Sequence, residues 1–137
     1  MIARRVFSAV LCVGFLTGCS MTQLAAGSTV KIIGEAWPAI ERYEDTELAE
    51  SGIPASIATM EGLLQVRPDD AELRSLLARA YGSFGFGFME DHMEEALAND
   101  DDKGGEHFRM RAAMAYTRGR VLALGTLSLW EKDDGGA

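Results

Sequence analysis

Residues 73–88 most constrain the fold, because their apolar side chains recur at the spacing of one face of an α-helix. Six positions form this face: Leu73, Leu76, Leu77, Ala80, Phe84 and Phe88. A stripe of this width must be buried against another element, and packing into a core is its usual explanation. Tyr81 borders the face, and together with Phe84 and Phe88 it is also a candidate for lining an apolar ligand cavity. Of the two explanations we favour the core.

Residues 84–88 read Phe-Gly-Phe-Gly-Phe, an alternation that on its own would also suit a strand. We interpret the segment as helix, because helical periodicity precedes it and residues 89–98 continue with helix-forming side chains. Gly82, Gly85 and Gly87 each cost about 1 kcal/mol relative to alanine in a helix. That cost indicates close approach by a neighbouring helix or by a ligand, and we favour helix packing.

Two stretches before this region also show apolar residues at helical steps. Residues 30–40 step by three, four and three, and Pro38 is expected to kink or end that helix. A short helical piece from Leu48 is expected to end at residues 51–52, because Pro54 suits the first turn of a new helix. The new helix carries a clean apolar stripe, formed by Ile53, Ile57, Met60 and Leu64.

Polar segments separate these helices. The helix that follows residue 46 has two candidate N-caps, Asp45 and Thr46. The next helix has Asp70, which follows Pro68, as its candidate N-cap. Residues 99–105 have the composition of a loop. A last helix is expected over residues 108–129. The side chains that we expect to face the core from this helix include Phe108, Ala112, Ala115, Leu122 and Leu129. Residues 131–137 form a polar tail that is expected to fray. No segment predicts a strand convincingly, so the fold class is all-α.

The first 18 residues have the form of a secretory signal peptide. Arg4 and Arg5 precede an apolar run over residues 6–16, which is shorter than the ~20 residues that a bilayer crossing needs. Residues 16–19, Leu-Thr-Gly-Cys, resemble the lipobox of bacterial lipoproteins, whose cysteine is acylated and becomes the new N-terminus. We therefore expect lipid on Cys19; the alternative is a plain signal peptide with an incidental cysteine. In Gram-negative lipoproteins an aspartate directly after this cysteine tends to retain the protein at the inner membrane. This chain has Ser20 there, so by analogy with those lipoproteins we expect it at the periplasmic face of the outer membrane.

The charge balance and the absence of motifs exclude several function classes. Lys and Arg number 13 against 21 Asp and Glu, a net charge of −8 that becomes 11 − 21 = −10 without Arg4 and Arg5. An acidic chain lacks the basic surface that phosphate binding requires, so we expect no nucleic-acid partner. No nucleophile elbow or phosphate loop is present. We therefore expect neither enzyme activity nor a cofactor.

An acidic run around His92 raises the question of a metal site. On a helix His92 has Glu95 three residues away, which gives two potential ligands, whereas zinc takes three or four from the protein. The other histidine, His107, would have to fold back. Residues 100–105 lack the ligand register of an EF-hand. We interpret these segments as a solvated acidic face and a loop, and expect no metal.

The helix at residues 73–88 also carries part of a repeat pattern. Leu77, Ala78 and Tyr81 have the tetratricopeptide spacing and follow the proline at position 68. Arg74 and Glu90 depart from the consensus at the tryptophan and alanine positions. The pattern therefore predicts antiparallel helical hairpins of a degenerate tetratricopeptide-like type.

Several blocks, taken in order, resemble the T component of tripartite ATP-independent periplasmic (TRAP) transporters. No single block is diagnostic, but their order and combined length cover most of residues 19–125. They are Met21–Ala25, Asp45–Ala49 with Pro54, Glu61–Leu64, Arg67–Tyr81, Gly87–Asp91 and Tyr116–Leu124.

The resemblance implies a lipid-anchored periplasmic accessory subunit with cryptic tetratricopeptide-like hairpins. It also implies a homotrimer, an apolar cavity in each protomer, and pairing with the periplasmic P-component solute receptor. The implied role is to pass a hydrophobic or organic-acid ligand to or from that receptor. The expected organisation is a signal peptide at 1–18, a helical-repeat domain at 19–130 and a tail at 131–137.

The chain departs from this family in length. Family members typically continue with further hairpins after the Arg-Gly-Arg block at residues 118–120, whereas this sequence stops soon afterwards. We therefore expect the last helix to expose a hydrophobic patch. Two alternatives follow: a ligand-free helical-repeat lipoprotein that serves as a protein-binding scaffold, or a truncated, non-functional fragment.

Overall fold

The computed structural model describes residues 2–134, and side chains from residue 21 to residue 132. Its elements are α1 (Ile2–Ile40), α2 (Thr46–Val66), α3 (Ala71–Phe84), the π-helical segment η1 (Gly85–Glu90), α4 (Asp91–Ala98) and α5 (Asp102–Asp134). No strand occurs in this part of the chain, so the all-α prediction is confirmed. The side chain of Cys19 and residues 135–137 lie outside the described part.

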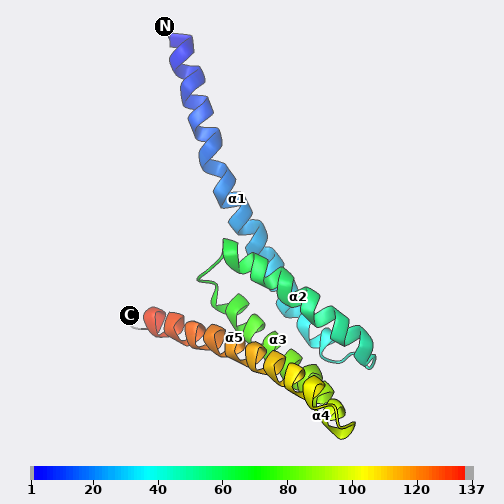
Figure 1. Ribbon diagram of the computed structural model, residues 1–137. Helices are drawn as coiled ribbons and strands as arrows, with labels where there is room; N and C mark the ends of the chain where they lie inside the picture. The colour runs from blue at the N-terminus through cyan, green and yellow to red at the C-terminus, as the bar shows by residue number, and fades with distance from the viewer. Residues whose placement is uncertain (1, 135–137) are drawn as a thin grey trace.

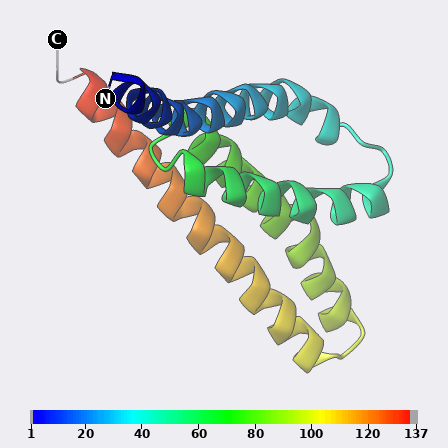
Figure 2. The same ribbon diagram turned by 90° about the horizontal axis from the view of Figure 1, so that it is seen from above.

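The helices form two antiparallel hairpins (Figure 1). In the first, α1 turns back into α2. In the second, α3, η1 and α4 make one long arm that runs antiparallel to α5 (Figure 2). Helix α3 packs against α1, α2 and α5, and therefore lies at the centre of the molecule. Hairpins are confirmed, whereas their assignment to the tetratricopeptide type stays a prediction.

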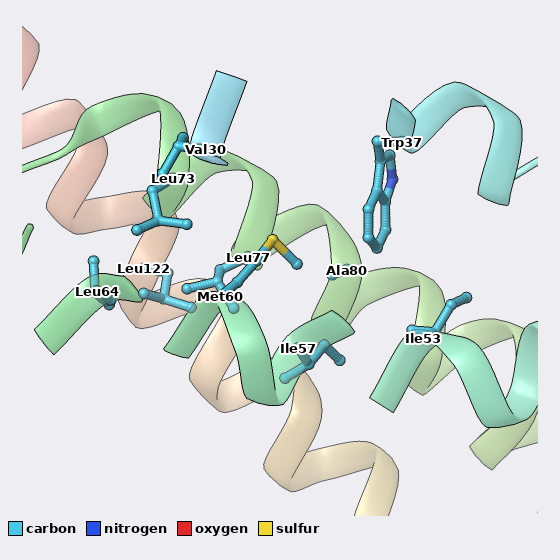
Figure 3. Packing of buried hydrophobic residues seen from close by; sticks show 10 residues of the cluster. All are labelled: Val30, Trp37, Ile53, Ile57, Met60, Leu64, Leu73, Leu77, Ala80 and Leu122. Atoms are coloured by element: carbon cyan, nitrogen blue, oxygen red, sulfur yellow. The ribbon is translucent and has the colours of Figure 1, made fainter. Parts of the chain in front are cut away.

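The hydrophobic core lies where these helices meet (Figure 3). Its buried residues are Val30, Trp37, Ile53, Ile57, Met60, Leu64, Leu73, Leu77, Ala80 and Leu122. All four predicted stripes contribute to it. Leu24, by contrast, is exposed. Phe108 and Leu129 are only partly buried.

Two aspartates cap helices as predicted. The side chain of Asp45 accepts a hydrogen bond from the backbone N–H of Leu48 (3.0 Å). Asp70 does the same for Leu73 (3.0 Å) at the start of α3. Each cap satisfies a backbone donor that the first turn leaves unpaired. Helix α1 ends at Ile40, two residues after Pro38.

The predicted break at residues 51–52 is wrong. Helix α2 is continuous, and Pro54 lies inside it. The buried stripe already begins at Ala49 and continues through Ile53, so packing against α1 and α3 offsets the hydrogen bond that proline removes. The hydroxyl of Ser56 donates to the carbonyl of Gly52 (3.0 Å), which adds a partner next to the proline.

Residues 84–88 are not a strand, as predicted, but neither are they regular α-helix. The π-helical turn of η1 shifts the inward positions by one, so that Gly85 and Met89 are buried while Phe86 is 72% exposed. Close packing between helices accounts for the glycine at position 85. A Cβ there would lie 2.9 Å from the ring of Tyr116, too close for a larger residue without movement of that ring. Gly82 and Gly87 face open space, so the prediction of close approach was wrong for them.

The predicted loop at residues 99–105 is shorter than its composition indicated. Helix α5 already begins at Asp102, and its far end extends through residues 131–134, where a frayed tail was expected. Asp101 accounts for the early start, because its carboxylate accepts the N–H of Gly104 (3.0 Å) and its carbonyl that of Gly105 (2.9 Å). The two glycines follow a strong N-cap, which outweighs their low helix propensity.

Candidate interaction surface

A polar cluster joins α2, α3 and α5. The guanidinium of Arg118 donates to both carboxylate oxygens of Glu61, at 2.8 Å and 2.6 Å. The hydroxyl of Tyr81 donates to the same carboxylate (3.0 Å). A bidentate pair of this kind fixes orientation as well as distance. The cluster therefore holds the face of α5 in a defined position relative to both partner helices.

The electrostatics of the cluster favour its charged form. The hydrogen bond from Arg118 holds the pKa of Glu61 below its ordinary value of 4.5, although burial opposes the shift. Burial, and then the bond to Glu61, raises the pKa of Tyr81. The bond to Glu61 likewise raises the pKa of Arg118. At neutral pH the carboxylate is therefore ionised and the phenol protonated.

The low pKa of Glu61 predicts a loss of stability in acid. Because its pKa is lower in the folded state, the stabilisation is complete above about pH 4.5 and disappears as the pH falls through the folded value. We expect Glu61→Gln to lower the free energy of unfolding by about 1 kcal/mol at pH 7, since the pair is partly exposed, and by almost nothing at pH 2–3. Urea denaturation at both pH values measures this difference.

The matched control is Glu106→Gln. Glu106 pairs with Arg109 within one helix and is half exposed, so we expect no measurable change at either pH. Equal losses at pH 7 and pH 3 for Glu61→Gln would contradict the assignment of this carboxylate as an ionised partner.

The Tyr-x-Arg-Gly block of α5 fits directly onto the opposite arm of the hairpin. Gly119 allows α5 to approach α3 closely, because a Cβ there would lie 3.2 Å from the carbonyl oxygen of Ala78. Tyr116 packs on Gly85 and donates its hydroxyl hydrogen to Glu90 (2.8 Å). Burial, with a smaller contribution from Glu90, raises the pKa of Tyr116 to about 12. The block is thus a packing motif.

Sequence reasoning missed the pairing of Glu61 with Arg118. The two residues are 57 positions apart, and charged residues at partly solvated helix positions carry no signal of their partners. Both residues lie in blocks that resemble the family, but the resemblance did not indicate that the two side chains form a pair. The cluster emerges once α2, α3 and α5 have been placed together.

The three predicted cavity residues lie close together beside the core. Phe84 and Phe88 form a tilted ring pair with centroids 6.3 Å apart, and both pack with Tyr81 against the core cluster. The guanidinium of Arg111 lies 5.7 Å from the centre of the Phe84 ring. The hydroxyl of Tyr81 is engaged with Glu61. These contacts fit a packing role, and a role in ligand binding stays a prediction.

Among the hollows on the surface of the described region are three that Tyr81, Phe84 and Phe88 do not line. An apolar one of about 250 Å³ lies between α1 and α2, lined by Ile33, Ala36, Ile40, Ala55, Ser56 and Thr59. A second, of about 370 Å³, lies along α5 and includes Met114 and Arg118. A third, of about 330 Å³, is polar and surrounds the α2–α3 turn.

Helix α5 is apolar on two opposite sides. One side, with Ala112, Ala115 and Leu122, is buried. The other side, which we call the outer face, consists of Met110, Met114, Val121 and Leu124, each at least half exposed. These four residues recur at steps of four, seven and three and so form one stripe. The predicted hydrophobic patch on the last helix is therefore confirmed, and a patch of this kind indicates an interaction site.

The model of one protein family, described as TRAP transporter T-component, matches residues 42–136. The match spans well over half of the chain and includes the whole α2–α5 region on which the polar cluster and the outer face lie. The chain belongs to the TRAP transporter T-component family. No curated protein and no solved structure matches it.

Membership gives the T-component chain its general role as an accessory component of a TRAP transporter, in partnership with other components of that system. The family is not a known enzyme family. It indicates a location in the periplasm or cell envelope. Among the helices that the structure describes, none combines the length and continuous hydropathy that crossing a bilayer requires.

His92 of this T-component serves as a contact between helices. Its Nε2 lies 2.6 Å from a carboxylate oxygen of Glu50 in α2, while its Nδ1 is 3.9 Å from Glu95. The imidazole also lies beside the ring of Phe108, with centroids 5.1 Å apart. Within residues that the structure describes, no three or more His, Cys, Asp or Glu side chains are grouped to hold a metal ion. The pairing with Glu50 was not predicted, because the two residues are 42 positions apart.

Proposed function

We propose that this chain is a lipid-anchored periplasmic subunit of a TRAP-type uptake system and that it binds the system's P-component solute receptor. The observation that carries the proposal is the family match over residues 42–136. In this proposal residues 1–18 are the signal peptide and residues 19–130 the helical-repeat domain, with a tail at 131–137. Cys19 carries the lipid, and Ser20 favours the outer membrane.

The outer face of α5 is the surface that we assign to the receptor. Protein interfaces combine an apolar centre with a polar rim, and here Met110, Met114 and Val121 form the centre while Arg120 lies at the rim. Methionine side chains adapt their shape to a partner more readily than branched residues do. The polar cluster around Glu61 supports the assignment, because it fixes α5 through Arg118, which borders this face.

A charge placed on this face is expected to weaken receptor binding. Met114 is 64% exposed, so Met114→Glu leaves the fold intact but places a carboxylate in the apolar centre. We expect the affinity for the receptor of the same TRAP system to fall at least tenfold, which corresponds to about 1.4 kcal/mol. Isothermal titration calorimetry of the detergent-solubilised lipoprotein with the receptor measures the change.

Leu97→Glu is the matched control. Leu97 is also half exposed, but it lies at the α4–α5 turn, away from the outer face. The substitution adds the same charge, so its affinity is expected to stay within twofold of the wild type. Equal losses in the two variants would point to net charge rather than to the outer face.

A homotrimer and the transfer of a hydrophobic or organic-acid ligand are further parts of the proposal, and the resemblance to the family supports them. The apolar hollow between α1 and α2 offers a site for an aliphatic group, since Ile33 and Ile40 line it. The packed state of Phe84 and Phe88 favours the alternative, a ligand-free scaffold. Native mass spectrometry distinguishes them: a trimer with added mass supports transfer, whereas a bare protein supports the scaffold.

A further inference from the structure

Gln23 in α1 and Gly125 in α5 both lie near the α2–α3 turn, at one side of the molecule. Nη1 of Arg67, in the α2–α3 turn, donates to the carbonyl of Gln23 in α1 (3.0 Å). Nε of Arg74 donates to the carbonyl of Pro68 in the same turn (2.7 Å). The Arg74 guanidinium also covers Gly125 of α5, where a Cβ would lie 2.5 Å from Nη1. Figure 1 shows this turn between α1 and the red end of α5.

Helix α5 extends past the start of α3 at this side. Gly125 lies beside Arg74, which is three residues into α3, and α5 continues to Asp134. Trp130 follows the buried Thr126 by one helical turn and therefore points to the same side of α5. Beyond the start of α3 there is no further turn of that helix to cover it, and the indole is 52% exposed.

Further exposed apolar side chains belong to the segments that adjoin these contacts. Together with Trp130 they form what we call the end surface: Met21, Leu24, Val66, Leu127 and Trp130. Three segments that are distant in sequence contribute to it, namely residues 21–24 of α1, the end of α2 and the end of α5. The contacts through Arg67 and Arg74 hold the three segments together.

We propose that the end surface lies against the lipid headgroups, so that the protein stands on the membrane with this end down. The inference rests on the proposed acylation of Cys19. Met21 is two residues further along α1, a rise of about 3 Å, so the acyl chains place this end at the bilayer. Tryptophan is the side chain most suited to that boundary, because its ring is apolar and its N–H is polar.

The proposal also gives the rest of the molecule an orientation. From Trp130 to the start of α5 the helix spans 28 residues, or about 42 Å. The α4–α5 turn therefore projects away from the membrane. Met110 and Met114, near that end of α5, would be presented to a receptor in the periplasm rather than to lipid.

Tryptophan fluorescence tests the orientation, because the chain has only two tryptophans and they differ in environment. Trp37 is fully buried in the core, whereas Trp130 is half exposed. The full lipoprotein is reconstituted into phosphatidylethanolamine–phosphatidylglycerol vesicles whose acyl chains carry bromine, a contact quencher. We expect bromine to quench more than half of the emission that Trp130 contributes. We expect Trp130→Phe to remove that quenching and leave the signal of Trp37 nearly unquenched.

A relocated tryptophan is the matched control. Phe86 is exposed on η1, far along the hairpin from the end surface, so the double variant Trp130→Phe, Phe86→Trp is expected to stay unquenched. Quenching in this double variant as strong as in the wild type, or no quenching at Trp130, would overturn the orientation. Mass spectrometry of Cys19 separates the two proposals: an unmodified cysteine overturns the anchor and this inference together, whereas an acylated protein with Trp130 unquenched overturns only this inference.

Discussion

The variant Cys19→Ala is expected to lose its acyl chains completely and with them its stable hold on the membrane. In the proposed function, residues 16–19, which resemble a lipobox, make this thiol the acceptor of the lipid. Each buried CH₂ contributes about 0.8 kcal/mol, so several acyl chains hold a protein far more firmly than its few exposed side chains. Mass spectrometry of the N-terminal peptide from the membrane fraction is the measurement: the wild type begins at an acylated Cys19, and the variant yields no acylated peptide.

Cys12 provides the matched control, because it is the only other cysteine and lies within the proposed signal peptide. Cys12→Ala is expected to leave both the acylated peptide and the membrane fraction unchanged. A wild-type protein whose N-terminal peptide carries an unmodified Cys19 would contradict the lipoprotein assignment and leave a plain signal peptide as the alternative.

The variant Leu77→Ala is expected to produce a large loss of stability. Leu77 is fully buried in the central helix α3, within the cluster that Figure 3 shows. Removing its isobutyl group costs the transfer free energy and leaves a cavity, together about 2–5 kcal/mol. The total free energy of unfolding of a domain of this size is about 5–15 kcal/mol, so this one substitution removes a large part of it. Urea denaturation followed by the emission of the buried Trp37 measures the loss.

Leu124→Ala makes the same chemical change on the outer face of α5. Leu124 is half exposed, and we expect the free energy of unfolding to change by no more than about 0.5 kcal/mol. A loss at Leu124 as large as at Leu77 would mean that the outer face is buried in the isolated protein, for example by a second copy of the chain.

The sequence predicted most of the core, because the helical period determines which side chains share a face. Leu73, Leu77 and Ala80 are buried as expected, and so is the stripe of α2. The two aspartate caps were predictable for a similar reason, since a cap depends on residues only three positions apart. These features are local, and local spacing contains the information that fixes them.

The errors arose where packing overrides local preference. Pro54 and the glycines of α5 both disfavour helix by propensity, yet a buried stripe in one case and the Asp101 cap in the other keep the chain helical. The π-helical turn at Gly85–Glu90 was not predicted, and the ring of Tyr116, which packs on Gly85 from another helix, was not predicted either. Helix propensity depends only on the residues within one segment, so it contains no information about side chains that pack on the segment from another helix.

The interaction surface was predicted in part. The expectation of an exposed patch on the last helix followed from the comparison with longer family members, in which further hairpins follow this helix, and the structure places that patch on the outer face of α5. The cluster of Glu61, Tyr81 and Arg118 was not predictable, because its members come from three helices and their pairing depends on the completed fold.

The most direct test of the central claim is native mass spectrometry of the acylated, detergent-released protein mixed with the solute receptor of the same TRAP system. We expect a species whose mass contains both proteins at low micromolar concentration, and we expect Met114→Glu to deplete it while Leu97→Glu does not. Separate masses for the two proteins, at every concentration up to about 100 μM, would contradict the account.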